Sequence, residues 1–554
     1  TLGGQIVLVN NQLSVSNGSF VHAEGLGSGH GGSVSINAGS VDINAKSILN
    51  VSGIGNAGGV SINAAALTID AGEINADSST LGGQIVLVNN QLSVSNGSYV
   101  HAESYGLGRG GSVTINAGNI DLDRSVIDTD THGSGNAGNL AVNAGSISIS
   151  NGGEFSSSTY SSGSGGNIAI NLTGDLQIHN GLNPAFVTGI LGTAFGSGKG
   201  GSVAVNVDGH IVLNGGSGVA EIGADSFGSG TGGNVAVNAG SISVANGGEI
   251  SSNAFKTGNA GTVDVNASGL LSVDGGTKGI AVISTDSLAA QGNAGSTRIN
   301  AGNLFITSGG EISSDAAFGT GRAGSVAINV AGTLTLDGGS TGIALISAFS
   351  ALSKGNSGDL TVKASDAVVR NGGEISTTAL GTQGNAGNIL IVVSGNLTID
   401  GGAIVSSTGA LPGIESTGNA GNVSVSAGSL EVTNKGIISA NTATSGEAGI
   451  VTVSTGSLSI SNDGAIVSNT FGAGNGGSVL VTADHLMISG ANNGLLTGIA
   501  ANAETGQTGN AGNVVVRAGD LTILHNGEIA GNTFGTGNGG NVSVDVTGPL
   551  MIDG

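Results

Sequence analysis

A short glycine-containing marker recurs along the whole chain and constrains the fold more than any other feature. The marker is a pair, usually Gly-Gly or Ala-Gly, just before a Val-x-Val or Val-x-Ile run. A period in its range indicates a solenoid, in which each repeat buries its apolar side chains against its neighbours. We therefore expect one continuous β-solenoid domain over residues 1–554. The second glycine of the marker falls at 19 positions, 25 to 35 residues apart and most often 28: Gly4, Gly32, Gly58, Gly83, Gly111, Gly138, Gly166, Gly201, Gly233, Gly261, Gly295, Gly324, Gly358, Gly387, Gly421, Gly449, Gly477, Gly512 and Gly540.

One repeat, residues 233–261, shows how a coil is built. Strict alternation of apolar with small or polar residues marks strands with one buried face, and Asn-Ala-Gly or Asn-Gly-Gly after a run suits a corner. Three short strands per coil, in about 19 coils of roughly 28–34 residues, predict an all-β parallel β-helix. A β-propeller needs about 40 residues per blade, more than this period provides. The alternating apolar residues form three runs: Val235 and Val237, Ile242 and Val244, and Ile250.

The beginning of the chain contains a duplicated block. Residues 1–19 reappear unchanged at 80–98, which indicates a 79-residue block, 1–79, whose copy starts the segment 80–158. Such copying extends a solenoid without disturbing a closed core. Both ends of the chain fall inside a repeat, so we expect it to be an excerpt of a longer protein.

The repeats between residues 233 and 421 alternate in length. Their spacings are 28 or 29 residues in one coil and 34 in the next. The longer coils carry insertions at 274–280 and 337–343. Insertions that recur at one corner stack on one side of a solenoid, and we expect that side to make binding or lateral contacts.

Composition excludes several classes of function. The net charge is −23, from 36 acidic and 13 basic residues, which argues against nucleic acid as a partner because phosphate binding needs clustered Lys and Arg. The chain has no cysteine, so it has neither disulfides nor thiolate metal sites. No apolar run approaches about 18 residues, so we expect no membrane insertion. Glycine accounts for 108 residues but proline for only 3, without a Gly-X-Y period, which excludes collagen.

Two residue types recur in register and are candidates for structural ladders. Asparagines that follow the first strand of a coil can form hydrogen-bonded side-chain stacks. Recurring phenylalanines, mostly in Phe-Gly-x-Gly, suit a stack of rings beside the core, although exposed aromatics also bind sugars. The asparagines are Asn37, Asn63, Asn116, Asn143, Asn206, Asn238, Asn266, Asn300 and Asn329. The phenylalanines are Phe195, Phe227, Phe255, Phe318, Phe471 and Phe534.

We predict no catalytic, cofactor-binding or metal-binding residues. Glutamates recur at Glu154, Glu249, Glu311, Glu374 and Glu528, but a regular ladder is a poor match to a glycosidase pair, and we interpret them as solvated corner residues. The 8 histidines show no metal-ligand spacing. A carbohydrate-binding or carbohydrate-cleaving β-helix stays open as an alternative, and the irregular coil at 179–186 is the best place for such a site.

The repeats resemble those of a known family. Gly-Asn-Ala-Gly-Asn-Val-Ser-Val-Ser-Ala-Gly-Ser-Leu at 418–430 and Asn-Gly-Gly-Glu-Ile-Ser-Ser at 246–252 resemble filamentous-haemagglutinin-like repeats. These occur in large two-partner-secretion exoproteins of cyanobacteria and other Gram-negative bacteria. The resemblance implies a right-handed β-helix, secretion through an outer-membrane partner, and a role in adhesion, surface fibres or biofilm.

These observations lead to one functional expectation. The chain is expected to be a rod-like structural or adhesive component of an extracellular filament or sheath, and not an enzyme. Its expected location is the cell surface of a Gram-negative-type bacterium. The expected partners are other copies of the chain, packed laterally or end to end, and other surface components or glycans.

Overall fold

The chain is an all-β solenoid of parallel strands with about 18 turns, as predicted for the fold class. The computed structural model describes residues 3–181, 187–276, 279–288, 291–339, 342–381, 383–411, 416–491, 495–504 and 508–554. The count is slightly lower than the predicted 19 coils. The last marker, Gly540, is followed by β44 and β45 but by no short strand in the described chain, so the last coil is incomplete. Among the described residues, no helix is long and apolar enough to cross a membrane.

The structure divides into two compact units. Unit 1 comprises Thr1–Ser268 and Gly279–Ser284, and unit 2 comprises Gly269–Lys278 and Thr285–Gly554. Strand β20 (Thr262–Asp274) has residues in both units. The single continuous domain expected for residues 1–554 stays a prediction.

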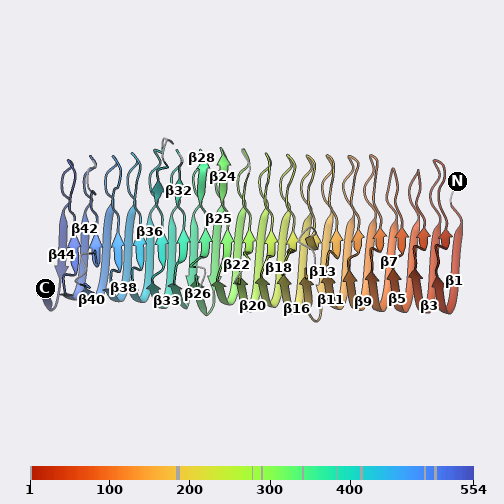
Figure 1. Ribbon diagram of the computed structural model, residues 1–554, viewed down its shortest axis with the longest axis horizontal. Helices are drawn as coiled ribbons and strands as arrows, with labels where there is room; N and C mark the ends of the chain where they lie inside the picture. Colours follow the sequence, from red (N-terminus) through yellow and green to blue (C-terminus); the bar gives the residue numbers. More distant parts are fainter. Residues whose placement is uncertain are drawn as a thin grey trace. The chain divides into compact units, whose positions relative to one another are not determined.

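Unit 1 is built from a long and a short strand in each turn (Figure 1). The long strands are β1 (Gln5–Val15), β3 (Ser33–Asn44), β5 (Gly59–Asp70), β7 (Gln84–Ser95), β9 (Ser112–Asp123), β11 (Asn139–Ser150), the pair β13 (Asn167–Leu172) and β14 (Leu176–His179), β16 (Ser202–Asn214) and β18 (Asn234–Ala245). The short strands are β2 (Phe20–His22), β4 (Ile48–Asn50), β6 (Glu73–Asn75), β8 (Tyr99–His101), β10 (Val126–Asp128), β12 (Glu154–Ser156), β15 (Val187–Leu191), β17 (Val219–Gly223), β19 (Gly248–Ser251) and β21 (Ala281–Ser284).

Unit 2 repeats this plan and adds a third set of strands. Its long strands are β22 (Ser296–Thr307), β25 (Ser325–Val330) with β26 (Thr333–Asp337), β29 (Leu360–Ala364) with β30 (Asp366–Arg370), β33 (Ile389–Asp400), β36 (Val423–Thr433), β38 (Ile450–Ser461), β40 (Ser478–Ser489), β42 (Val514–Leu524), and β44 (Val542–Val546) with β45 (Leu550–Asp553). The short strands are β23 (Gly310–Ser313), β27 (Ala344–Ser347), β31 (Gly373–Ser376), β34 (Ala403–Val405), β37 (Ile437–Ser439), β39 (Ala465–Val467), β41 (Gly498–Ala500) and β43 (Glu528–Ala530). The third set forms a four-stranded sheet of β24 (Ala316–Gly319), β28 (Ser350–Ser353), β32 (Ala379–Leu380) and β35 (Thr408–Gly409).

The first two predicted strands of a coil are joined in most turns. In the parallel pairing of β1 with β3, Asn10 is the partner of Ala38 and Gln12 is the partner of Ser40. Gly39 between them has no partner, which marks a corner inside the long strand. At this corner the buried side shifts by one residue, since positions 34 and 36 and then 41 and 43 are buried. Within the described chain, the corner divides the long strand completely in four turns, which contain the pairs β13 and β14, β25 and β26, β29 and β30, and β44 and β45.

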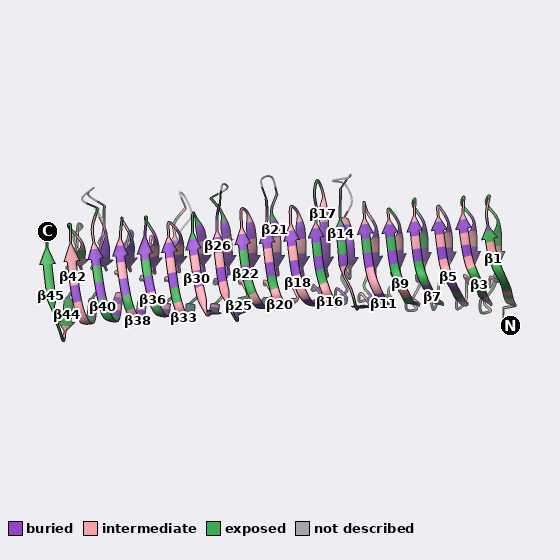
Figure 2. Ribbon diagram, turned by 90° about the horizontal axis from the view of Figure 1, so that it is seen from below, coloured by how far each residue is buried: buried purple, intermediate pink, exposed green. Residues whose placement is uncertain are grey.

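The core lies where the alternation places it. In the coil at 233–261, all five apolar residues of the three runs are at most 2% exposed. Figure 2 shows the same alternation of buried and more exposed residues along the long strands. Because parallel neighbours pair in register, each apolar residue packs above an equivalent one in the next turn.

The glycine marker has a steric cause. The backbone of one turn passes so close to the next that a Cβ on Gly111 would lie 2.0 Å from the carbonyl oxygen of Gly83. A Cβ on Gly138 would lie 1.9 Å from the carbonyl oxygen of Gly111. Only a residue without a side chain fits at this corner, which explains why the marker recurs in every turn.

Candidate functional site

A ladder of asparagine amides runs along the long strands. In unit 1, each amide donates from Nδ2 to Oδ1 of the asparagine one turn earlier, over 2.8 to 3.1 Å. This series joins Asn116, Asn143, Asn171, Asn206, Asn238 and Asn266. In unit 2, Asn329 donates to Asn300 over 3.1 Å. The amides bond to one another on the outside of the sheet, and Asn171 is a member that the sequence analysis missed.

An aromatic column lies beside the isolated bridges of unit 1. Six rings stack in consecutive turns, with centroids 4.5 to 5.5 Å apart and planes within 11° of parallel. They belong to Tyr105, His132, Tyr160, Phe195, Phe227 and Phe255. The phenylalanines were candidates in the sequence, whereas Tyr105, His132 and Tyr160 were not, because the search followed one residue type.

The other three candidate phenylalanines are not brought together. No ring contact joins them among the described residues. Phe471 and Phe534 lie two turns apart, because the register passes from Thr470 to Ala503 and then to Thr533. The turn between them has Glu504 in the aromatic position. Phe318, in unit 2, is 61% exposed, and the ladder places Leu352 opposite it.

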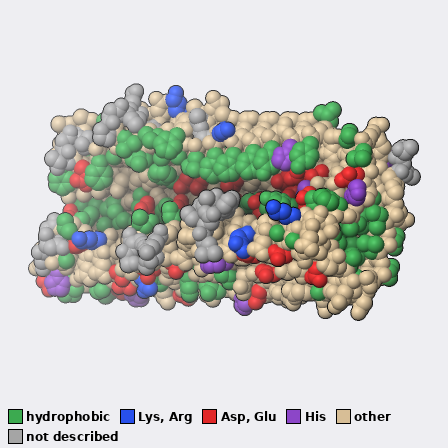
Figure 3. All heavy atoms as spheres, turned by 45° about the vertical axis from the view of Figure 1, so that its right-hand side comes forward, with side chains coloured by type: hydrophobic (Ala, Val, Ile, Leu, Met, Phe, Trp, Pro, Cys, Tyr) green, Lys and Arg blue, Asp and Glu red, His purple; other side chains and the backbone are tan. Residues whose placement is uncertain are grey.

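Acidic side chains gather next to aromatic ones. Figure 3 shows, on one face of the molecule, a stripe of hydrophobic side chains with Asp and Glu side chains along its edge. In unit 1, the Tyr105 hydroxyl donates a hydrogen bond to Oε2 of Glu103. Burial raises the pKa of the Tyr160 phenol, and the nearby carboxylates of Asp130 and Glu154 raise it further.

The interpretation of the recurring glutamates as corner residues is wrong, and only Glu528 among them is exposed to solvent as expected. Glu154, Glu249, Glu311, Glu374 and Glu528 all lie within short strands. Burial raises the pKa of Glu154 to about 7, against a hydrogen bond with Ser156 that lowers it. The Asn-Gly-Gly corner ends one residue earlier than the sequence pattern suggests, so the glutamate already belongs to the strand.

Five titratable side chains from three successive turns meet in unit 1. Asp77, Glu103 and Asp130 each precede a residue of the isolated-bridge ladder that joins Ser78, Ser104 and Thr131. His101 and Asp128 are paired in the short strands β8 and β10. Ligand atoms of Asp77, His101 and Glu103 lie within 4.8 Å of one another, and so do those of Glu103, Asp128 and Asp130.

His101 is held between two carboxylates. Its Nδ1 lies 2.9 Å from Oδ2 of Asp77, and its Nε2 lies 3.0 Å from Oε1 of Glu73. Although burial lowers the pKa of His101, these hydrogen bonds and charges leave it well above its usual range. The two carboxylates therefore favour the protonated imidazole, whose charge offsets part of the negative charge around it.

Among the residues that the structure describes, no cationic side chain lies at hydrogen-bond distance from Asp128 or Asp130. They are 4% and 6% exposed. Burial and the charges of Asp130 and Glu103 raise the pKa of Asp128 well above its usual range, although His101 lowers it. Burial raises the pKa of Asp130 to about 7, against hydrogen bonds from Ser156 and Ser158 that lower it. Each carboxylate thus favours a proton or a cation.

Sequence reasoning missed this cluster because it searched for local spacing. His101 and Asp128 are one full turn apart along the chain, and so are Glu103 and Asp130. Only the register brings them together. Aligning the repeats by strand pairing would have placed Asp128 below His101 and Asp130 below Glu103.

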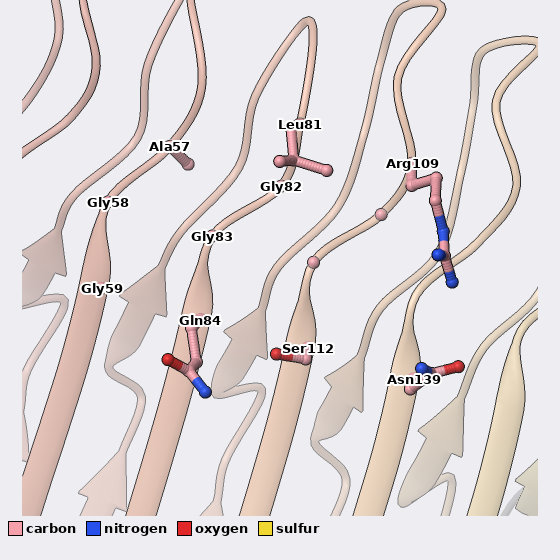
Figure 4. A pocket seen from close by; sticks show the side chains of 12 residues that line it. Ala57, Gly58, Gly59, Leu81, Gly82, Gly83, Gln84, Arg109, Ser112 and Asn139 are labelled. Carbon is pink, nitrogen blue, oxygen red and sulfur yellow. The ribbon is translucent and has the colours of Figure 1, made fainter.

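A shallow hollow of about 550 Å³ lies over the glycine corners of unit 1 (Figure 4). Its wall is mostly backbone, from the corners at 57–59, 81–84 and 109–112. Arg109 is the one charged side chain among the residues that line it. The hollow follows from the absence of side chains at the stacked glycines, so it is a consequence of the fold.

Two regions singled out in the sequence are only partly described. The irregular coil at 179–186 lies outside the described residues from 182 to 186. The insertions at 274–280 and 337–343 lie outside them at 277–278 and 340–341. The described residues of these regions add no side chain to the cluster of titratable groups.

Comparisons of the chain with protein-family models, curated protein sequences and solved structures found no match. The resemblance to filamentous-haemagglutinin-like repeats therefore stays a prediction.

Proposed function

We propose that the chain is a structural and adhesive scaffold, the repeat region of an extracellular surface filament. The observation that carries this proposal is the repetition of outward-facing columns turn after turn. The asparagine ladder and the aromatic column are periodic surfaces with a spacing of one strand, about 4.8 Å. A periodic surface suits a periodic partner, such as another copy of the chain or a polymer, better than a single small molecule.

The proposed location is the outside of a Gram-negative-type bacterium, reached through an outer-membrane secretion partner. The repeat motifs at 418–430 and 246–252 are the support for this part of the proposal. The absence of cysteine is compatible with it, because a continuous core needs no disulfides. No catalytic role is proposed for any residue.

Glycan binding is the second candidate, because four rings of the aromatic column are 39 to 55% exposed. Sugars stack on open aromatic faces. In this column the faces of Tyr160, Phe195 and Phe227 are covered by the neighbouring rings, which leaves their edges to solvent. The geometry therefore favours the scaffold over a sugar platform.

Immunogold labelling of cells that make the protein tests the proposal. Antibodies raised against the purified chain should label intact cells at extracellular material, and cells without the gene should attach less to surfaces. Labelling confined to permeabilised cells would contradict a surface role. A glycan array with the purified chain tests the alternative, which requires saturable binding that Phe195→Ala removes.

A further inference from the structure

We propose that Glu103, Asp128 and Asp130 form a binding site for a divalent cation of the calcium class. The site lies in unit 1, between the turn that contains β8 and the turn that contains β10. It is independent of the adhesive role proposed above, because it rests on the side chains of two turns only.

The three carboxylates are close enough to share one ion. One oxygen of each lies within 4.8 Å of the others. Calcium binds oxygen at about 2.4 Å, so two ligands on opposite sides of the ion are about 4.8 Å apart. The Glu103 side chain is 12% exposed, which leaves a path for the ion and for the water molecules that complete its coordination.

A second observation points to a ligand at this place. Oδ1 of Asp128 is fully buried and has no hydrogen-bond partner among the described residues. A buried carboxylate oxygen without a partner is unfavourable, and native proteins rarely leave one. The hydrogen bonds that reach Asp130, from Ser156 Oγ and Ser158 N, both end at Oδ1 over 2.6 Å, so Oδ2 can turn to a cation.

The adjacent group of Asp77, His101 and Glu103 is the weaker candidate. Both nitrogens of His101 are already engaged by carboxylates, Nδ1 at 2.9 Å from Asp77 and Nε2 at 3.0 Å from Glu73, so neither is open to a metal. The contacts of Glu103 with Tyr105 and His132 leave further lone pairs on its oxygens. The donors at the proposed site are therefore all oxygen, which favours Ca²⁺ over Zn²⁺.

The duplicated block provides an internal comparison. Glu24 stands where the second copy has Glu103, and the ladders place Asn50 and Ser52 where it has Asp128 and Asp130. In the first copy the Asn50 amide donates to Oε1 of Glu24 over 2.5 Å, so a neutral group satisfies the glutamate. The same backbone thus carries an amide in one copy and two additional carboxylates in the other.

The first copy also supplies the test variant. Asp128→Asn combined with Asp130→Ser gives the second copy the residues of the first, which the fold accommodates. Asp121→Asn, an exposed change in the same turn, is the matched control. The probe is terbium(III), which substitutes for calcium. Its emission is sensitised by a nearby excited tyrosine, and Tyr105 is the tyrosine next to this site. The measurement uses the intact chain with excitation of its tyrosines.

We expect tyrosine-sensitised terbium emission in the wild-type chain and in Asp121→Asn, displaced by Ca²⁺. The double variant should bind at least about 10-fold more weakly, because charge count sets calcium affinity. Emission that is equal in all three proteins, or displaced by Zn²⁺ but not by Ca²⁺, would overturn the proposal.

Thermal unfolding with EDTA and with Ca²⁺ gives an independent readout. Calcium should raise the wild-type melting temperature and leave the double variant unchanged. No response of the wild-type melting temperature to calcium would overturn the site. If the double variant does not fold, Asp128→Asn alone provides the same comparison.

Discussion

A single methyl group is enough to disturb the contact between two turns at a glycine corner. In Gly111→Ala, the new Cβ would lie 2.0 Å from the Gly83 carbonyl oxygen, so one of the two backbones must move. We expect a loss of about 1–3 kcal/mol in the free energy of unfolding, the range of an overpacked core. Chemical denaturation followed by circular dichroism measures it.

Gly27→Ala is the control for this substitution. No heavy atom lies within 4 Å of the position that its Cβ would take. Its stability should stay within about 0.5 kcal/mol of wild type. Equal losses in the two variants would show that glycine is needed at these positions for a reason other than the approach of neighbouring turns.

Buried carboxylates make the stability of the protein depend on pH. Burial raises the pKa of Glu311 to about 7, and the charge of Asp286 adds to this. Between about pH 4.5 and 7 the unfolded chain has released this proton while the folded chain still holds it. The free energy of unfolding therefore falls as pH rises, by up to about 1.4 kcal/mol per pH unit for this group.

Glu311→Gln should flatten that pH dependence, because the amide does not titrate. Urea unfolding at pH 4.5, 5.5, 6.5 and 7.5 gives the slopes for comparison. Glu431→Gln, which changes an exposed glutamate in β36, should follow the wild-type curve. A Glu311→Gln curve as steep as that of wild type would contradict the assignment.

At the scale of the element, the contribution of ring stacking in the aromatic column to stability can be measured. Phe227 stacks on Phe195 at 5.5 Å and on Phe255 at 4.5 Å. Each such pair is worth about 0.5–1.5 kcal/mol beyond burial. Phe227→Ala should therefore lose about 1–3 kcal/mol locally, and amide hydrogen exchange should speed up around the bond from the Phe227 N–H to the Ala194 carbonyl.

Phe534→Ala is the comparison for the column. Phe534 is 55% exposed and has no ring contact among the described residues. Its exchange pattern should change less than that of Phe227→Ala. Faster exchange of equal size in both variants would mean that loss of apolar contact, and not stacking, supports the column.

The sequence predicted the strands well because burial acts directly on them. Positions such as Val235 and Ile250 face the core, and a polar residue there would be buried without a partner. The cluster around Asp128 escaped prediction for a different reason. Its members come from separate turns, and their proximity depends on the register between those turns. Because the coils vary in length from 25 to 35 residues, the spacing along the sequence does not show this register. The sequence predicted only the phenylalanines of the aromatic column, because tyrosine and histidine take their place in its first turns.

At the scale of the whole molecule, whole turns should be removable. Deletion of residues 423–450 joins Asn422 to Val451, the residue that pairs with Val423 in the parallel ladder. Since each turn contacts mainly its neighbours, we expect the shortened chain to fold with the same strand content per residue. Circular dichroism and size-exclusion chromatography check the fold.

Deletion of residues 423–436, half of that length, is the contrasting case. It joins Asn422 to the short strand β37 and places apolar residues opposite corner residues. We expect loss of cooperative unfolding and aggregation of the product. Similar folding of the two shortened chains would contradict a register-matched solenoid.

The duplicated block suggests how such a chain gains new chemistry. Residues 1–19 and 80–98 are identical, while one copy continues to Asn50 and the other to Asp128 at equivalent places. Once a segment exists twice, outward side chains in one version are free to diverge, because the inward ones already guarantee folding. A lineage of such proteins would acquire novel surface properties by copying first and substituting later, with no need to invent another architecture.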